Sequence, residues 1–162
     1  MEQKITNIAN KVGVASLKKK YTIAVAESVT SGNLQVAFSL AKNAILFYQG
    51  GITVYNIGQK CRHLSVEPTH AIDSNCVSKK ISDQMALAVA EMFSSDIGVG
   101  ITGYASSVPE QNVNKLFAYL SVSIRKKIVL SKKLNAPAEA PNKVQFFYTE
   151  NTLRLLVEVL KI

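Results

Sequence analysis

The sequence predicts an α/β sandwich built around a mixed sheet. Through the first two thirds of the chain, short apolar runs alternate with segments whose apolar residues recur at helical spacing. Nearer the C-terminus, two further apolar runs flank a tight basic turn, which predicts an antiparallel pair of strands. No repeat, linker or low-complexity stretch interrupts the 162 residues, so we expect residues 1–162 to form a single domain.

The chain begins with a predicted amphipathic helix that ends near Lys18-Lys19-Lys20, where cations complement the helix dipole. Its apolar residues recur at helical spacing, namely Ile5, Ile8, Val12 and Ala15. The β-branched run 21–25 follows as a buried strand.

The stretch 26–32, Ala-Glu-Ser-Val-Thr-Ser-Gly, organises the chain, because it joins this strand to a second helix that we expect to end near Lys42-Asn43. The apolar residues of that helix are Leu34, Ala37, Phe38 and Ala41. Backbone N–H groups at such a turn suit an anionic ligand or a developing oxyanion. A plainer interpretation is that Ser28, Thr30 or Ser31 only caps the helix.

Gly50-Gly51 is expected to open a second strand, 52–55, and residues 56–64 form a short helix that carries Lys60. Glu67-Pro68-Thr69 is expected to be a break. Ser78 can cap a longer helix whose inward face holds Ile81, Met85, Ala88 and Met92, widened by Val89 and Phe93.

The glycine-rich run 96–102 predicts a buried strand that continues into a loop over 103–109. Strands at 116–124 and 128–134, joined by Arg125-Lys126-Lys127, and a final helix from about Glu139 or Asn142 to Leu160 complete the prediction. Ligands bind beyond the carboxyl ends of parallel strands. The turn at 27–31, the exit after Tyr55 and the loop at 103–107 are therefore expected to meet in one pocket.

Composition excludes several classes of protein. No apolar run is long enough to span a membrane, and the first residues lack the apolar segment of a signal peptide, so we expect a cytoplasmic protein without a membrane partner. The net charge is +8, but no aromatic residues alternate with the basic runs, so nucleic acid is not the expected partner. Cys61 and Cys76 lack the spacing of a metal site, and we expect neither a metal nor a cofactor.

Three of these stretches resemble the CinA C-terminal family, the nicotinamide-nucleotide amidase domain. Residues 26–32 resemble its AESCTGG motif, and Gly51-Ile52-Thr53-Val54-Tyr55 with Lys60 resembles its GG-x-x-x-Y-S-N-x-x-K segment. Val77-Ser78 falls at its AVS helix start, and Thr102-Gly103 at its GIAGP-type loop. The motifs follow in order from about Lys11 to Leu160.

The resemblance implies a three-layer α/β/α sandwich with a mainly parallel sheet, acting as a hydrolase in pyridine nucleotide salvage. The domain would convert nicotinamide mononucleotide to nicotinate mononucleotide and ammonia without a metal. It implies Ser28 as the nucleophile, Lys60 as its general base and Tyr55 as a supporting hydrogen-bond donor. The residues expected to bind substrate are Glu27, Thr30, Ser31, Gly32, Gly51, Gly103, Tyr104, Ala105 and Ser106. The apolar first and last helices could form a homodimer interface.

The chain departs from the family's pattern in its binding loops. Ser31 replaces one of the paired glycines, Ile57 stands at the usual asparagine, and the glycine- and proline-rich loop is replaced by residues 104–114. Glycine lets bare backbone N–H groups cradle a phosphate. Two hypotheses remain open: an amidase with altered recognition of a pyridine nucleotide or related amide, or a catalytically silent relative that binds a nucleotide or a protein partner.

Overall fold

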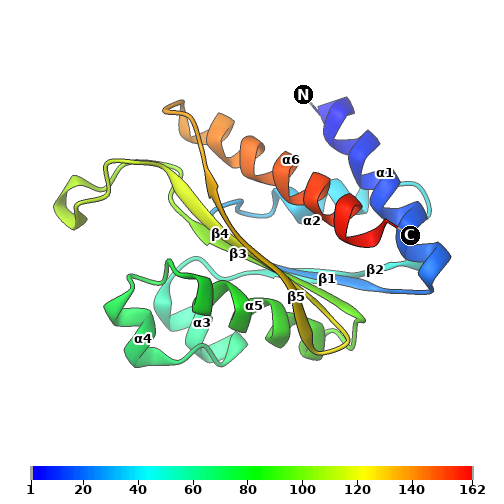
Figure 1. The fold of residues 1–162 in the computed structure, drawn as a ribbon, viewed down its shortest axis with the longest axis horizontal. Coiled ribbons are helices and arrows are strands. Elements are labelled where there is room, and N and C mark those ends of the chain that lie inside the picture. Colours follow the sequence, from blue (N-terminus) through cyan, green and yellow to red (C-terminus); the bar gives the residue numbers. More distant parts are fainter. Residues whose placement is uncertain (1, 162) are drawn as a thin grey trace.

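The computed structural model describes residues 2–161, which form a central sheet covered by helices on both faces (Figure 1). In chain order the elements are α1 (Glu2–Lys19), β1 (Ile23–Glu27), α2 (Asn33–Ser39), the 3₁₀ turn η1 (Ala44–Leu46), β2 (Tyr48–Thr53), α3 (Ile57–Leu64), α4 (Pro68–Asp73), α5 (Lys79–Met92), β3 (Ile97–Gly103), the 3₁₀ turn η2 (Pro109–Gln111), β4 (Phe117–Ile124), β5 (Lys127–Asn135) and α6 (Pro141–Leu160).

The sheet is mixed, with strand order β2-β1-β3-β4-β5. β1 pairs in parallel with both β2 and β3, whereas β4 runs antiparallel to both β3 and β5. Every strand other than β4 therefore points the same way. The predicted hairpin is confirmed.

Helices α1, α2 and α6 cover one face of the sheet, and α3, α4 and α5 cover the other (Figure 1). Each face has its own apolar core. The first contains Val12, Phe38 and Tyr148, and the second contains Leu64 and Met85. The α/β/α sandwich implied by the resemblance is confirmed.

Several element boundaries differ from the prediction. The paired glycines lie inside β2 rather than opening it, and α2 ends at Ser39, before the predicted Lys42-Asn43. The break expected at 67–69 lies earlier, at residues 65–67 between α3 and α4, and Pro68 and Thr69 are helical. Glu67 accepts hydrogen bonds from Thr69 N and His70 N, and Pro68 occupies the first turn, where a missing N–H costs no hydrogen bond, so a short helix forms.

Helix α5 begins as predicted, because the Ser78 hydroxyl accepts a hydrogen bond from Ile81 N. Ile81, Met85 and Val89 are buried against the sheet. Met92, in contrast, is exposed, because it lies on the last turn, where α5 ends beyond the core.

The parallel strands bring three loops to one edge of the sheet. Glu27, the last residue of β1, pairs with Thr53 at the end of β2 and with Ile101 near the end of β3. The residues that follow each strand are therefore neighbours, as predicted for a ligand site at this edge. Within residues 2–161, no helix is both long enough and apolar enough to cross a membrane.

Candidate functional site

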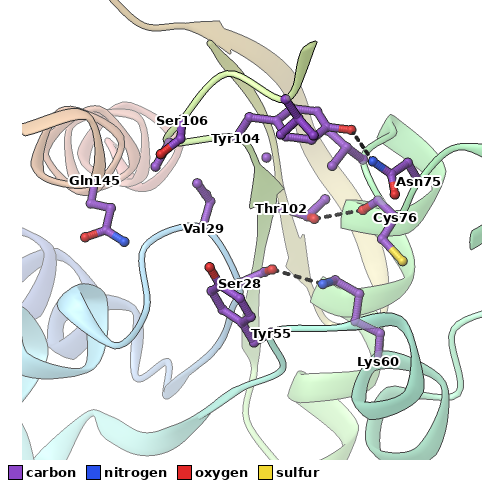
Figure 2. Close-up of a pocket in the computed structure, with 14 residues that line it drawn as sticks. Ser28, Val29, Tyr55, Lys60, Asn75, Cys76, Thr102, Tyr104, Ser106 and Gln145 are labelled. Carbon is purple, nitrogen blue, oxygen red and sulfur yellow. Dashed lines mark hydrogen bonds between the residues drawn. The ribbon is translucent and has the colours of Figure 1, made fainter. Parts of the chain in front are cut away.

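A cavity of about 280 Å³ opens at this edge of the sheet (Figure 2). The turn after β1, the start of α3, the loops before α5 and after β3, and one residue of α6 line it. These residues are Ser28, Val29, Tyr55, Lys60, Asn75, Cys76, Val77, Thr102, Gly103, Tyr104, Ala105, Ser106, Val108 and Gln145.

Ser28 is the first residue beyond β1, and the sheet fixes its backbone. Its N–H donates a hydrogen bond of 3.1 Å to Ile101 O on the neighbouring strand, and its carbonyl accepts one of 3.2 Å from Ser31 N. The residue is only 6% exposed. Its hydroxyl therefore faces the cavity from a rigid position.

Lys60 reaches the same point from α3, whose first turn is capped when Asn56 Oδ1 accepts a hydrogen bond from Gln59 N. Its ammonium nitrogen Nζ donates hydrogen bonds of 2.9 Å to Ser28 Oγ and 3.0 Å to Val54 O. The side chain is 1% exposed. The segment of chain between these two residues contains α2, η1, β2 and the first turn of α3.

Burial lowers the pKa of Lys60 below 10.5, the value of an unperturbed lysine, because the charged form loses its water. The neighbouring thiols of Cys76 and Cys61 act in the opposite direction and more weakly. A buried lysine with a lowered pKa, hydrogen-bonded to a serine hydroxyl, can act as a general base. The structure therefore brings together the residues expected to be nucleophile and base.

Glu27 lies outside the cavity lining, and its carboxylate stabilises the turn that leads into α2. Its fully buried carboxylate accepts hydrogen bonds from Thr30 Oγ1 at 2.5 Å, Gly32 N and Leu34 N at 3.1 Å each, and Gln35 N at 2.9 Å. These are the N–H groups at the start of α2. The expectation that they face a ligand or an oxyanion is wrong, because a carboxylate of the chain itself occupies them.

Among the described residues of this turn, the backbone N–H groups of Val29 and Thr30 donate no hydrogen bond, and only Val29 lines the cavity. Val29 directly follows Ser28. An N–H beside the attacking hydroxyl is well placed to receive the oxyanion of a tetrahedral intermediate.

Tyr55 lies at the rim of the cavity. Its side chain is 73% exposed, and its hydroxyl makes no hydrogen bond within the described residues. The structure thus places it beside Ser28 and Lys60 without a direct bond to either, where a ligand could meet it (Figure 2).

The last residues of β3 and the loop that follows supply the opposite wall. Thr102 Oγ1 donates a hydrogen bond of 2.8 Å to Cys76 O, and Tyr104 O accepts one of 3.0 Å from Tyr148 OH on α6. Asn75 Nδ2 donates to Tyr104 OH at 2.9 Å (Figure 2). It also donates to Gln111 Oε1. These bonds join the loop to two helical regions, so the wall is supported from both sides.

The residues expected to bind substrate divide into two groups. Gly103, Tyr104, Ala105 and Ser106 line the cavity. Glu27, Thr30, Ser31, Gly32 and Gly51 lie outside its lining: Gly32 has a left-handed φ of 98° as the N-cap of α2, and a Cβ on Gly51 would lie 2.6 Å from Val25 Cγ2. The second group supports the turn and the neighbouring strand.

Seven lining residues were not among those expected to form the site, although Val29, Val77, Thr102 and Val108 lie within the resembling stretches or the loop that replaces one of them. The seven are Val29, Asn75, Cys76, Val77, Thr102, Val108 and Gln145. Asn75 precedes the Val77-Ser78 motif by two residues, whereas Gln145 on α6 lies far from every motif and reaches the cavity through tertiary packing. A left-handed φ of 51° at Asn75 and 59° at Cys76 marks the bend that turns this loop inward.

Both cysteines are free. Within residues 2–161, no group of three or more His, Cys, Asp or Glu side chains is placed to hold a metal ion.

Comparison with known proteins matches residues 5–160 to the model of the CinA C-terminal domain. The chain belongs to this CinA family. A relative from Mycoplasma pneumoniae, the protein MG115 homolog, is 30% identical over 146 residues, covering 89% of this chain and 91% of the relative. A CinA-like protein of Thermosynechococcus vestitus is 30% identical over 143 residues, which cover 86% of this chain but 34% of that protein.

The CinA fold is equally clear from solved structures. A CinA superfamily protein of Klebsiella pneumoniae superposes with a TM-score of 0.87 at 19% identity, covering 96% of this chain and 97% of the other. A competence/damage-inducible protein of Agrobacterium tumefaciens gives 0.88 at 19% identity over 98% and 96%. Among the curated relatives, several are much longer: the chain spans only 21–38% of the length of four of them.

Proposed function

We propose that the protein hydrolyses the carboxamide of a pyridine nucleotide or a related pyridine amide, with Ser28 as nucleophile and Lys60 as general base. One observation carries the proposal: a lysine that is 1% exposed holds its Nζ 2.9 Å from the hydroxyl oxygen of a serine facing the cavity. Nicotinamide mononucleotide is the substrate that family membership suggests, and its hydrolysis would yield nicotinate mononucleotide for pyridine nucleotide salvage.

In the first half of the reaction, Ser28 Oγ attacks the carbon of the carboxamide while its proton passes to the neutral amine of Lys60. The tetrahedral intermediate places its oxyanion against Val29 N–H. The carbon–nitrogen bond then breaks, and Lys60 returns the proton to the departing nitrogen, which leaves as ammonia. The product on the protein is an ester of Ser28.

In the second half, water attacks the ester carbonyl and gives its proton to Lys60. The bond to Ser28 Oγ breaks, and the proton returns to that oxygen as the carboxylic acid leaves. Atoms balance as amide plus water giving acid plus ammonia. Val54 O accepts a hydrogen bond from Lys60 Nζ, and this contact keeps the amine directed at Ser28 in both halves.

Ammonia release from nicotinamide mononucleotide and from nicotinamide riboside tests the proposal. Turnover by the unaltered protein should vanish in Ser28→Ala and in Lys60→Met. Two matched controls, Ser39→Ala on the exposed end of α2 and Lys132→Met on the exposed face of β5, should retain it. Equal turnover in Ser28→Ala and the parent would reject Ser28 as nucleophile.

The alternative is a catalytically silent member of the family that binds a nucleotide or a protein partner. It predicts no ammonia from either substrate in protein that is folded. The buried pair argues against it, because burying a lysine costs free energy, and one hydroxyl and one carbonyl offset that cost only in part.

A further inference from the structure

Tyr104, in the wall of the cavity, is fixed by contacts to three separate parts of the chain. Its backbone N–H donates a 2.9 Å hydrogen bond to Phe117 O on β4, and its carbonyl accepts the 3.0 Å bond from Tyr148 OH on α6. Its hydroxyl accepts a 2.9 Å bond from Asn75 Nδ2, and its ring packs edge-on against that of Phe117 with the centroids 5.4 Å apart. Backbone, hydroxyl and ring are therefore all held in place.

Asn75 clasps the loop that contains Tyr104 from outside it. It lies in the turn between α4 and α5, and its amide nitrogen, which carries two hydrogens, donates to Tyr104 OH and to Gln111 Oε1, 29 and 36 positions away. Its φ of 51° is left-handed, a conformation that asparagine adopts more readily than most residues. The residue is exposed, so its amide serves these two bonds rather than the core.

Tyr104 thus forms a rigid aromatic surface on the cavity. Its ring extends along the wall toward Asn75, across the cavity from Ser28 (Figure 2). A flat ring packs favourably against an aromatic ring, both in an offset stack and edge to face. Because the ring is already fixed, packing a ligand on it costs less conformational entropy than ordering a mobile side chain would.

The other tyrosine of the cavity lacks this support. Tyr55 is 73% exposed, and its hydroxyl makes no hydrogen bond within residues 2–161. Of these two rings, that of Tyr104 is the one whose position is set before a ligand binds.

We propose that Asn75 is a positioning residue that determines specificity: by holding Tyr104, it presents the ring as a fixed packing surface for the flat ring of an aromatic carboxamide. Saturated amides lose this contact. The inference rests on the proposed amide hydrolysis and deepens it, since it states how this chain recognises the ring of its substrate. Asn75 takes no part in the chemistry at Ser28.

The first test compares two neutral amides that differ in the flatness of the ring. Benzamide and cyclohexanecarboxamide are titrated by NMR into Ser28→Ala, which prevents turnover during the measurement. Benzamide should bind about threefold more tightly or better, although the saturated ring is the more hydrophobic of the two. Equal binding, a preference for cyclohexanecarboxamide, or binding of neither amide would overturn the inference.

Asn75→Gly, in the same Ser28→Ala background, removes the clasp without straining the backbone, because glycine accepts a left-handed φ freely. It should reduce the preference for benzamide by at least about half. The matched control is Asn112→Gly, an exposed asparagine of the same loop with a φ of 57° and no side-chain hydrogen bond among the described residues. The control should keep the full preference. An unchanged preference in folded Asn75→Gly, or an equal loss in the control, would overturn the role of Asn75.

A double-mutant cycle tests whether Asn75 acts through Tyr104. Tyr104→Phe keeps the ring and removes the oxygen that accepts the hydrogen bond from Asn75. Adding Asn75→Gly to Tyr104→Phe should therefore cause little further loss of preference. Tyr104→Leu, which removes the ring, should abolish the preference. Losses that simply add would overturn the proposed route through Tyr104.

Kinetics with an intact Ser28 separate this inference from the proposed function. For nicotinamide mononucleotide, Asn75→Gly should raise KM about threefold or more and leave kcat within about twofold, whereas a loss confined to kcat would overturn the inference. Serine-dependent ammonia release together with a benzamide preference that ignores Asn75 would remove Asn75 and leave the amidase in place. A preference that depends on Asn75 in a folded protein that releases no ammonia would reject the hydrolysis and keep the recognition of the ring.

Discussion

Lys60 Nζ lies 2.9 Å from Ser28 Oγ, although 32 positions separate the two residues in the chain. The parallel pairing of β1 with β2 accounts for the approach, because Glu27 and Thr53 are partners at the ends of these strands. Ser28 and Val54 follow directly, and the first turns of α3 then direct Lys60 back toward the sheet. The short segments that follow the paired ends of β1 and β2 thus bring Ser28 and Lys60 together.

The first prediction concerns pH. Burial lowers the pKa of Lys60, and the free amine is the form that accepts the proton of Ser28. We expect kcat/KM to increase as pH rises through this lowered pKa, with a midpoint below 10.5. Burial raises the pKa of Tyr48 to about 12, so this phenol stays protonated over the same range.

A Lys60→Arg variant tests that assignment, since a guanidinium stays protonated and cannot act as a base. It should lose activity at every pH while remaining folded. A rate that rises with the same midpoint in Lys60→Arg would assign the titration to another group.

The second prediction concerns the carboxylate of Glu27. Glu27→Gln removes the charge and one acceptor from a buried group that takes three backbone N–H bonds and one hydroxyl. The free energy of unfolding should fall by about 2–3 kcal/mol, measured by urea denaturation. Glu91→Gln, an exposed carboxylate on α5, is the matched control and should change stability by less than about 0.5 kcal/mol. Equal effects would argue against the capping role.

The third prediction concerns the close approach of α5 to β3. A Cβ on Gly100 would lie 2.5 Å from Ser82 O and 2.6 Å from Ala86 N, both backbone atoms of α5. Gly100→Ala should therefore destabilise the fold by about 1–3 kcal/mol or more, because helix and strand must separate.

Gly58 provides the comparison for Gly100. It lies exposed in α3, and the nearest atom to a new Cβ would be Asn56 Oδ1 at 3.5 Å. Gly58→Ala should stabilise the fold by about 0.5–1 kcal/mol, because alanine loses less backbone entropy on entering a helix. Thermal unfolding of both variants should show changes in stability of opposite sign. A stability change of the same sign in both would contradict the packing argument.

The fourth prediction concerns the wall of the cavity. Tyr148→Phe removes the hydroxyl that donates a 3.0 Å hydrogen bond to Tyr104 O. Stability should fall by about 1 kcal/mol, and KM should rise more than kcat falls, since the loop positions substrate rather than reacting with it. Burial also raises the pKa of Tyr148, so the effect should be the same at neutral and alkaline pH. A loss confined to kcat would place Tyr148 in the chemical step.

The fold could be predicted from the sequence where the apolar pattern is strong. The spacing of Ile5, Ile8 and Val12 predicts α1, and all three are buried. The break expected at 67–69 falls at 65–67 instead, because a proline in the first turn begins a helix as readily as it interrupts one, and Pro68 begins α4. Local sequence does not distinguish these two uses.

The residues of the site also divide into those that the sequence predicts and those that only the three-dimensional structure reveals. Ser28 and Lys60 belong to ordered motifs and could be named in advance. The occupation of the α2 N–H groups by Glu27 could not, because four donors from a single turn meet its carboxylate only in three dimensions. Gln145 also lacked a signal, since it neighbours the buried Val144 on α6 and reaches the cavity only through tertiary packing.

The most direct test of the Ser28–Lys60 centre is nucleophile trapping of the ester on Ser28. Hydroxylamine added during turnover of a pyridine carboxamide should divert the acyl group to a hydroxamate, which chromatography separates from the acid. We predict that the unaltered protein forms hydroxamate in proportion to hydroxylamine and that Ser28→Ala forms none. Acid and ammonia released without any hydroxamate, or hydroxamate formed equally by Ser28→Ala, would contradict a covalent path through Ser28.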